Sequence, residues 1–127
     1  MNIIPRRVHG ILDYVVAVLL ILSPRIFGFD SAAAEARVPV ILGWVTLAYS
    51  LLTNYELGLF KVLPFRAHLT IDMIGGLFLA VSPWLFAFSD RVWGPHLVIG
   101  LLEVGAVLMT RTAASEQGEV AGTPAPR

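Results

Sequence analysis

The chain has 127 residues, of which 57% are hydrophobic and 14% charged, and its mean hydropathy is +0.77. A soluble globule of this size cannot bury so much apolar surface, so the composition indicates a membrane protein. The 9 basic and 9 acidic side chains cancel, which excludes the basic footprint of a nucleic-acid-binding protein, and no cysteine is present to form disulfides or thiolate metal sites.

Charged residues divide the chain into four apolar segments, and each is long enough to cross a bilayer as a helix, which takes about 20 residues. The sequence therefore predicts an all-α membrane protein with four transmembrane helices in a domain covering residues 1–112. Residues 113–127, rich in Ala, Gly, Pro and Glu, are expected to form a disordered C-terminal tail. The four segments run from Arg7 to Arg25, from Arg37 to Glu56, from Arg66 to Asp90 and from Arg91 to Arg111.

The second half of the chain repeats the first. Matching residues are 59 positions apart in the first helix of each half (68 minus 9) and 57 apart in the second (100 minus 43). Repeat 1 covers about 8–55 and repeat 2 about 67–111. Each repeat is expected to be a helical hairpin, and two hairpins entering the membrane in the same direction are related by a pseudo-two-fold axis along the membrane normal. The aligned pairs are His9 with His68, Asp13 with Asp72, Ser23 with Ser82, Pro24 with Pro83, Pro39 with His96, Gly43 with Gly100, Thr46 with Glu103 and Thr53 with Thr110.

A Ser-Pro dipeptide follows the apolar run in both repeats, in ILSPRIFGFD (21–30) and AVSPWLFAFSD (80–90). Because proline lacks an amide hydrogen and fixes its own φ, Ser-Pro is expected to end the first helix, or to begin a short new one with serine as its N-cap. The aromatic residues that follow are expected to anchor the chain at the headgroup level. The motif residues are Ser23, Pro24, Ser82, Pro83 and Trp84, and the aromatic residues are Phe27, Phe29, Trp84, Phe86 and Phe88.

With Ser82, Pro83 and Trp84 at the end of the first helix of a duplicated hairpin, the chain resembles the SPW-repeat family of small bacterial integral membrane proteins. The resemblance covers residues 9–110, and Arg25 stands at the tryptophan position of the first repeat. It implies a helical hairpin repeat in the bacterial inner membrane. No activity, catalytic residue or cofactor comes with it.

Basic residues near the helix ends predict the orientation. Five lie on the side that holds both termini and the middle loop, against three on the other side. Because cytoplasmic loops carry the excess of Lys and Arg, both termini are expected to be cytoplasmic. The two groups are Arg6, Arg7, Lys61, Arg66 and Arg111, and Arg25, Arg37 and Arg91.

Ionisable side chains in an apolar layer are the candidate functional residues, because each costs about 2.5–3.5 kcal/mol to insert. His9 and Asp13 are four residues apart, as are His68 and Asp72, so each pair lies on one helix face. The aspartates are roughly 9 Å from the cytoplasmic end of their helices, and Glu103 is roughly 12 Å from the same side. These five residues form the candidate ion or proton site.

Three interpretations of these residues remain open. Two imidazoles and two carboxylates can complete a tetrahedral zinc-type site, although the sequence does not identify a metal. Alternatively, each aspartate bonds its own histidine, Tyr14, Thr70 or a neighbouring helix and holds the bundle together. In a third interpretation, His9 and His68 are paired axial ligands of a haem. Glu103 is expected to be buried among small residues.

No phosphate-binding loop, zinc-protease motif or nucleophile elbow is present, so we expect no catalysis and predict no cofactor. The preferred interpretation is a non-enzymatic scaffold or accessory subunit of the membrane. The alternative is a small proton- or metal-ion-coupled transporter or binding protein that uses the intramembrane His, Asp and Glu. The expected partners are the lipid bilayer and either a second copy of the chain or another membrane protein.

Overall fold

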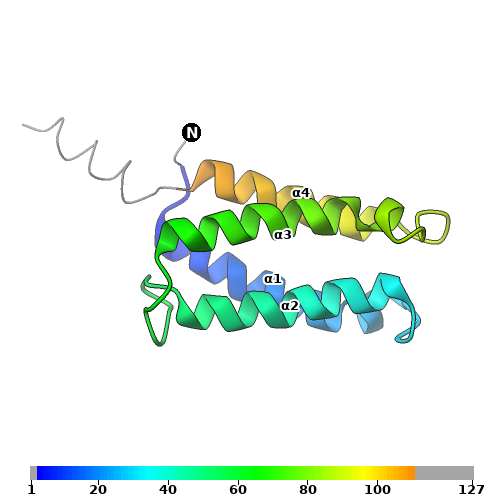
Figure 1. The fold of residues 1–127 in the computed structure, drawn as a ribbon, viewed down its shortest axis with the longest axis horizontal. Helices are drawn as coiled ribbons and strands as arrows, with labels where there is room; N and C mark the ends of the chain where they lie inside the picture. Colours follow the sequence, from blue (N-terminus) through cyan, green and yellow to red (C-terminus); the bar gives the residue numbers. More distant parts are fainter. Residues whose placement is uncertain (1–2, 111–127) are drawn as a thin grey trace, which may run out of the picture.

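The computed structural model of the chain describes residues 3–110, where it forms four helices that run along its long axis (Figure 1). The helices are α1 (Arg6–Phe27), α2 (Ala34–Leu52), α3 (Phe65–Leu85) and α4 (Gly94–Met109). The turns within the α1–α2 and α3–α4 pairs lie at one end, and the connection from α2 to α3 lies at the other (Figure 1). The predicted tail, 113–127, lies outside the described residues.

Three of the four helices have the length and composition of membrane spans. They are α1, α2 and α3, with 22, 19 and 21 residues, whereas α4 has 16. At 1.5 Å per residue α4 is about 24 Å long, shorter than a bilayer core of about 30 Å. The outward faces of all four helices are apolar, with exposed side chains such as Val15, Ile41, Ile74 and Leu102.

Small residues allow the helices to approach closely within each half. A Cβ atom added to Gly43 of α2 would lie 2.8 Å from the carbonyl oxygen of Ala17 on α1. A Cβ atom added to Gly100 of α4 would lie 2.5 Å from the carbonyl oxygen of Gly76 on α3. Real Cβ atoms do not come that close, so both helix crossings require glycine. The two contacts involve residues that the sequence repeat aligns. Gly75, by contrast, has open space around its Cα.

The Ser-Pro dipeptides neither end nor begin a helix, which corrects the prediction. Pro24 lies inside α1 and Pro83 inside α3. A proline inside a helix leaves the carbonyl four residues earlier without its usual donor. Here the preceding serine donates its hydroxyl hydrogen to that same carbonyl, at 2.7 Å in both repeats. Serine is therefore not an N-cap, and the helix continues because serine supplies the hydrogen bond that proline removes. The bonds are Ser23 Oγ to Leu20 O and Ser82 Oγ to Leu79 O.

Two of the five predicted anchor aromatics are buried or half-buried against the bundle. Phe88 is fully buried and Phe29 is half-buried. Both rings contact the imidazole of His96, with centroid distances of 4.9 Å and 5.3 Å. Repeat symmetry explains the pairing, because Phe29 and Phe88 are equivalent positions that meet on one central residue. The other three, Phe27, Trp84 and Phe86, are exposed.

Short extended segments join the two halves at the end that holds the first turns of α1 and α3. Ile4 bridges Thr110, and Leu63 bridges Thr53, so each segment pairs with the end of a second helix. A proline, Pro5 or Pro64, then precedes the helix. These bridges bring Thr53 and Thr110 beside the first turns of α3 and α1.

Candidate functional site

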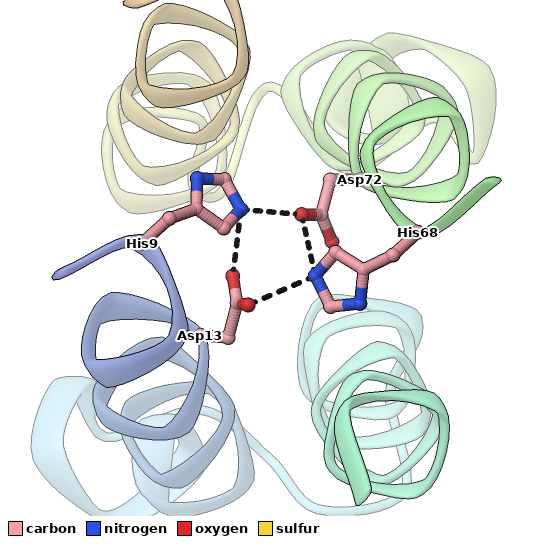
Figure 2. A group of neighbouring side chains, drawn as sticks. All are labelled: His9, Asp13, His68 and Asp72. Carbon is pink, nitrogen blue, oxygen red and sulfur yellow. Dashed lines mark hydrogen bonds and ion pairs between the residues drawn. The ribbon is translucent and has the colours of Figure 1, made fainter. Parts of the chain in front are cut away.

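A ring of two histidines and two aspartates lies in the centre of the bundle (Figure 2). His9 Nε2 is 3.1 Å from Asp13 Oδ1 and 2.8 Å from Asp72 Oδ2. His68 Nε2 is 2.8 Å from Asp13 Oδ2 and 3.0 Å from Asp72 Oδ2. All four side chains are buried, the most exposed being Asp13 at 7%. One ligand atom from each residue lies within 4.8 Å of the other three.

Helical spacing and the repeat together build the ring. His9 and Asp13 are one turn apart on α1, and His68 and Asp72 are one turn apart on α3. In Figure 2, α1 and α3 lie at opposite corners of the bundle and direct these side chains toward each other. Each aspartate therefore contacts its own histidine and the histidine of the other repeat. The sequence predicted the contacts within a repeat, and the contacts across the bundle come from the packing.

Two threonines determine where the imidazole protons lie. Thr53 Oγ1 donates its single hydrogen to the carbonyl of Tyr49 (2.6 Å), so it accepts a hydrogen bond from His68 Nδ1, 2.7 Å away. Thr110 Oγ1 likewise donates to a carbonyl of α4 and accepts from His9 Nδ1 at 2.7 Å. Both imidazoles therefore carry a proton on Nδ1 and direct Nε2 toward the carboxylates.

This tautomer restricts what the ring can hold. An imidazole protonated only on Nδ1 has a lone pair on Nε2, and a lone pair cannot face a carboxylate oxygen at 2.8 Å without a positive group between them. The positive group is either one proton for each histidine–aspartate pair, two in all, or a single cation shared by the four side chains. Two protons and one divalent cation give the same total charge, and both leave a ring with two carboxylates electrically neutral.

Two tyrosines donate hydrogen bonds to the aspartates of the ring. The Tyr49 hydroxyl donates a hydrogen bond to Asp72 Oδ1, and the Tyr55 hydroxyl donates to Asp13 Oδ2 at 3.3 Å. Burial raises the pKa of the Tyr55 phenol well above its usual range, so this group remains a neutral donor. Such outer partners fix the orientation of carboxylates that bind a metal.

Glu103 lies beside the ring and is not part of it. Its side chain is half-buried and lines a cavity of about 290 Å³ between α1 and α4, together with Asp13 and Asp72. Glu103 makes no hydrogen bond to any other residue in the described part of the chain. The expected burial of this carboxyl against protein is therefore only partial. The walls of the cavity are mainly apolar side chains, including those of Leu12, Leu102 and Met109.

The remaining candidates from the sequence have other roles. Tyr14 donates to the carbonyl of Leu57 (2.7 Å), and Thr70 donates to a carbonyl of its own helix. Neither bonds an aspartate. Paired haem ligation does not fit, because His9 Nε2 and His68 Nε2 both contact Asp72 Oδ2 and leave no space for a porphyrin between them.

Four groups around the ring were not predicted as site residues: Thr53, Thr110, Tyr49 and Tyr55. The repeat alignment contained a signal for the threonines, since Thr53 and Thr110 are equivalent and directly follow the last residues of α2 and α4. No sequence signal pointed to the tyrosines. Thr110 is 101 residues from the histidine that it bonds, so only the closed bundle brings them together.

Apolar outer faces, helices of membrane-spanning length and an internal repeat define a small helical membrane protein. The family model of the SPW repeat domain matches residues 7–110. The chain therefore belongs to the SPW repeat family. Neither a curated protein nor a solved structure gave a significant match.

Proposed function

We propose that this chain is a non-enzymatic membrane protein that binds one divalent transition-metal ion, of the zinc type, in the ring of His9, Asp13, His68 and Asp72. The observation that carries the proposal is the convergence of four ligand atoms within 4.8 Å of one another in the interior of the bundle. Two imidazole nitrogens and two carboxylate oxygens are a ligand set that zinc accepts in tetrahedral geometry.

The surrounding residues support a metal site. A metal-binding histidine usually donates its second ring N–H to a fixed partner, and Thr53 and Thr110 accept those hydrogen bonds here. Zinc bonds of about 2.0–2.1 Å place tetrahedral ligands about 3.3–3.4 Å apart. The contacting atoms are now 2.8–3.1 Å apart. These nitrogen and oxygen atoms would move apart by a few tenths of an ångström when one metal ion replaces the two protons.

Charge balance makes this exchange suitable for an apolar layer. The ring with two protons and the ring with one divalent ion have the same net charge, so binding adds no charge to the membrane interior. One metal ion enters and two protons leave, as expected when ligands must be deprotonated to bind. The same neutral exchange is what a proton-coupled metal carrier would require.

The proposal includes a membrane setting. We place the two repeats in the bacterial inner membrane as hairpins that enter from the same side, with α4 as the fourth span and both termini cytoplasmic. The apolar outward faces and the excess of basic residues at the end that holds Arg6 and Arg66 support this orientation. Four helices are too few to enclose a transport pathway, so a transport role would require association with a second copy.

Zinc content of the purified protein after equilibrium dialysis tests the proposal. We expect one zinc per chain in the wild type, loss of zinc in an Asp13→Asn, Asp72→Asn double variant, and retention in Asp90→Asn, whose side chain is 80% exposed. In weak buffer, addition of zinc should release two protons per ion. A wild type that binds no zinc, together with a destabilised double variant, would make the ring a structural cross-link and the protein a scaffold.

A further inference from the structure

The two sides of the ring differ although the repeat predicts equivalent surroundings. On the side facing α2, Tyr49 covers the ring, with its phenol edge against His68 at a centroid distance of 4.9 Å. Its hydroxyl donates to Asp72 and lies 3.5 Å from Thr46 Oγ1. The position equivalent to Tyr49 on α4 is 106 (49 plus 57), and this residue is Ala106.

The cavity lies where a second phenol would be. Ala106 lines it, together with His9, Asp13 and Glu103. The last three residues are the repeat equivalents of His68, Asp72 and Thr46, which are the groups that contact Tyr49. The vacant place therefore has the same surroundings as the filled one, with a carboxyl group in place of the threonine hydroxyl.

Among the described residues, Glu103 is the polar group of the cavity that lacks a hydrogen-bond partner. The only polar side chains along its wall in the described part of the chain are His9, Asp13, Asp72 and Glu103. The first three already bond one another in the ring, whereas Glu103 has no hydrogen bond to a described residue. A hydroxyl placed like that of Tyr49 would lie between Asp13 and Glu103 and could bond either carboxyl.

The apolar part of the cavity fits a ring with a tail. Its rim includes Leu12, Leu102 and Met109, which are exposed on the outer surface of α1 and α4. The cavity therefore opens sideways, toward the side of the bundle that faces lipid. Its volume of about 290 Å³ is just below the range for small-molecule pockets, roughly 300–1,000 Å³.

We propose that this cavity, named here the α1–α4 pocket and lined by His9, Asp13, Glu103 and Ala106, binds a hydroxyl-bearing aromatic ring. The ring hydroxyl donates to Asp13 as Tyr49 donates to Asp72, Glu103 is its second polar contact, and the ring lies against His9. The chemistry is that of a free phenol or of the head group of a quinol lipid whose tail leaves between α1 and α4. The inference goes beyond the metal proposal and does not require an ion in the ring.

Calorimetric titration of 4-propylphenol into the full-length protein in lipid nanodiscs, against empty nanodiscs, tests this inference. Propylbenzene, which lacks the hydroxyl, is the matched probe. Ala106→Tyr should fill the pocket with the chain's own phenol, and Leu108→Tyr adds the same group to an exposed position of the same helix. Glu103→Gln removes a carboxylate and nearly preserves the shape.

We expect saturable binding of 4-propylphenol, at least tenfold weaker binding of propylbenzene, loss of binding in Ala106→Tyr and retention in Leu108→Tyr. Glu103→Gln should weaken binding severalfold, and it keeps the inference testable if Ala106→Tyr does not fold. Equal binding of the two probes, equal binding to Ala106→Tyr, or no binding to the wild type would overturn the inference.

Two further measurements separate the ligand sources and the two proposals. A prenylated hydroquinone that binds at least tenfold more tightly than 4-propylphenol supports a quinol lipid, and equal affinity supports a free phenol. Zinc content of Ala106→Tyr tests the metal site independently, because the substitution leaves all four ring residues in place. Loss of phenol binding with zinc retained in this variant would support both proposals. Phenol binding by a wild-type protein that holds no zinc would refute only the metal proposal.

Discussion

Replacement of Thr53 by valine removes a hydroxyl from beside the ring and nearly preserves the side-chain shape. In the native protein this hydroxyl accepts the His68 Nδ1 hydrogen at 2.7 Å, and Thr53 is fully buried. Without it, His68 can move its proton to Nε2 in the metal-free ring, where carboxylates accept it. Metal binding requires Nε2 to be free, so the proton must return to Nδ1, which then has no partner.

The expected magnitude follows from that unpaired N–H. A buried donor without an acceptor costs roughly 1–3 kcal/mol. Loss of an outer partner of a metal ligand usually weakens metal affinity by roughly 10- to 100-fold, which corresponds to about 1.4–2.7 kcal/mol. The two values agree, so we expect the zinc dissociation constant of Thr53→Val to rise by roughly 10- to 100-fold.

Competition with a chromophoric zinc chelator measures this change. Thr53→Ser keeps the hydroxyl and should bind zinc within a few fold of the wild type. Thr70→Val is the matched control, because Thr70 donates only to a carbonyl of its own helix and is exposed. Unchanged zinc affinity in a folded Thr53→Val variant would refute the role assigned to the hydroxyl and the tautomer derived from it.

Three further predictions concern contacts away from the ring. Ser82→Ala should lower the free energy of unfolding by about 1 kcal/mol, because the carbonyl left free by Pro83 loses its donor, and it should have little effect in a Pro83→Ala background. Equal losses in both backgrounds, measured by chemical denaturation, would contradict this explanation. Gly100→Ala should cost about 1–3 kcal/mol through a clash with the backbone of α3, whereas Gly105→Ala, with open space around it, should be neutral or slightly stabilising; a tolerated Gly100→Ala would mean that the crossing is looser than described. Arg6 donates two hydrogen bonds to the carboxylate of Glu56 and holds the pKa of Glu56 below its ordinary 4.5, so the pair stabilises the fold above that pH and the contribution disappears as the pH falls through the depressed pKa. Both side chains are partly exposed (31% and 44%), so Glu56→Gln should lower the free energy of unfolding by less than about 1 kcal/mol at pH 7 and should have no effect in acid. Thermal melts at both pH values measure this difference. If the variant is destabilised equally in acid, the ion pair is not the cause of the destabilisation.

The positions of the helices could be predicted from the sequence because charges interrupt the apolar runs at intervals set by bilayer thickness. The ends were less predictable. Pro24 is expected to stop a helix, yet Ser23 supplies the missing hydrogen bond and α1 continues to Phe27. That compensation depends on one side-chain rotamer, which a local pattern does not reveal.

The ring was predictable in part. Spacing of four residues brought His9 near Asp13, and the repeat implied a second pair at equal depth. The contacts between the pairs depend on how α1 and α3 cross the bundle, which spacing alone does not determine. The difference between Tyr49 and Ala106 is visible in the aligned repeats, but only the structure shows that Ala106 lines the α1–α4 pocket.

The most direct test of the central claim is X-ray absorption at the zinc edge on the zinc-loaded protein in detergent. The ring predicts four nitrogen or oxygen ligands at about 2.0–2.1 Å with the outer-shell scattering of two imidazoles. It also predicts that the imidazole signal disappears in an Asp13→Asn, Asp72→Asn variant. Zinc surrounded by six oxygen atoms, or an imidazole signal unchanged in that variant, would contradict metal binding at the ring.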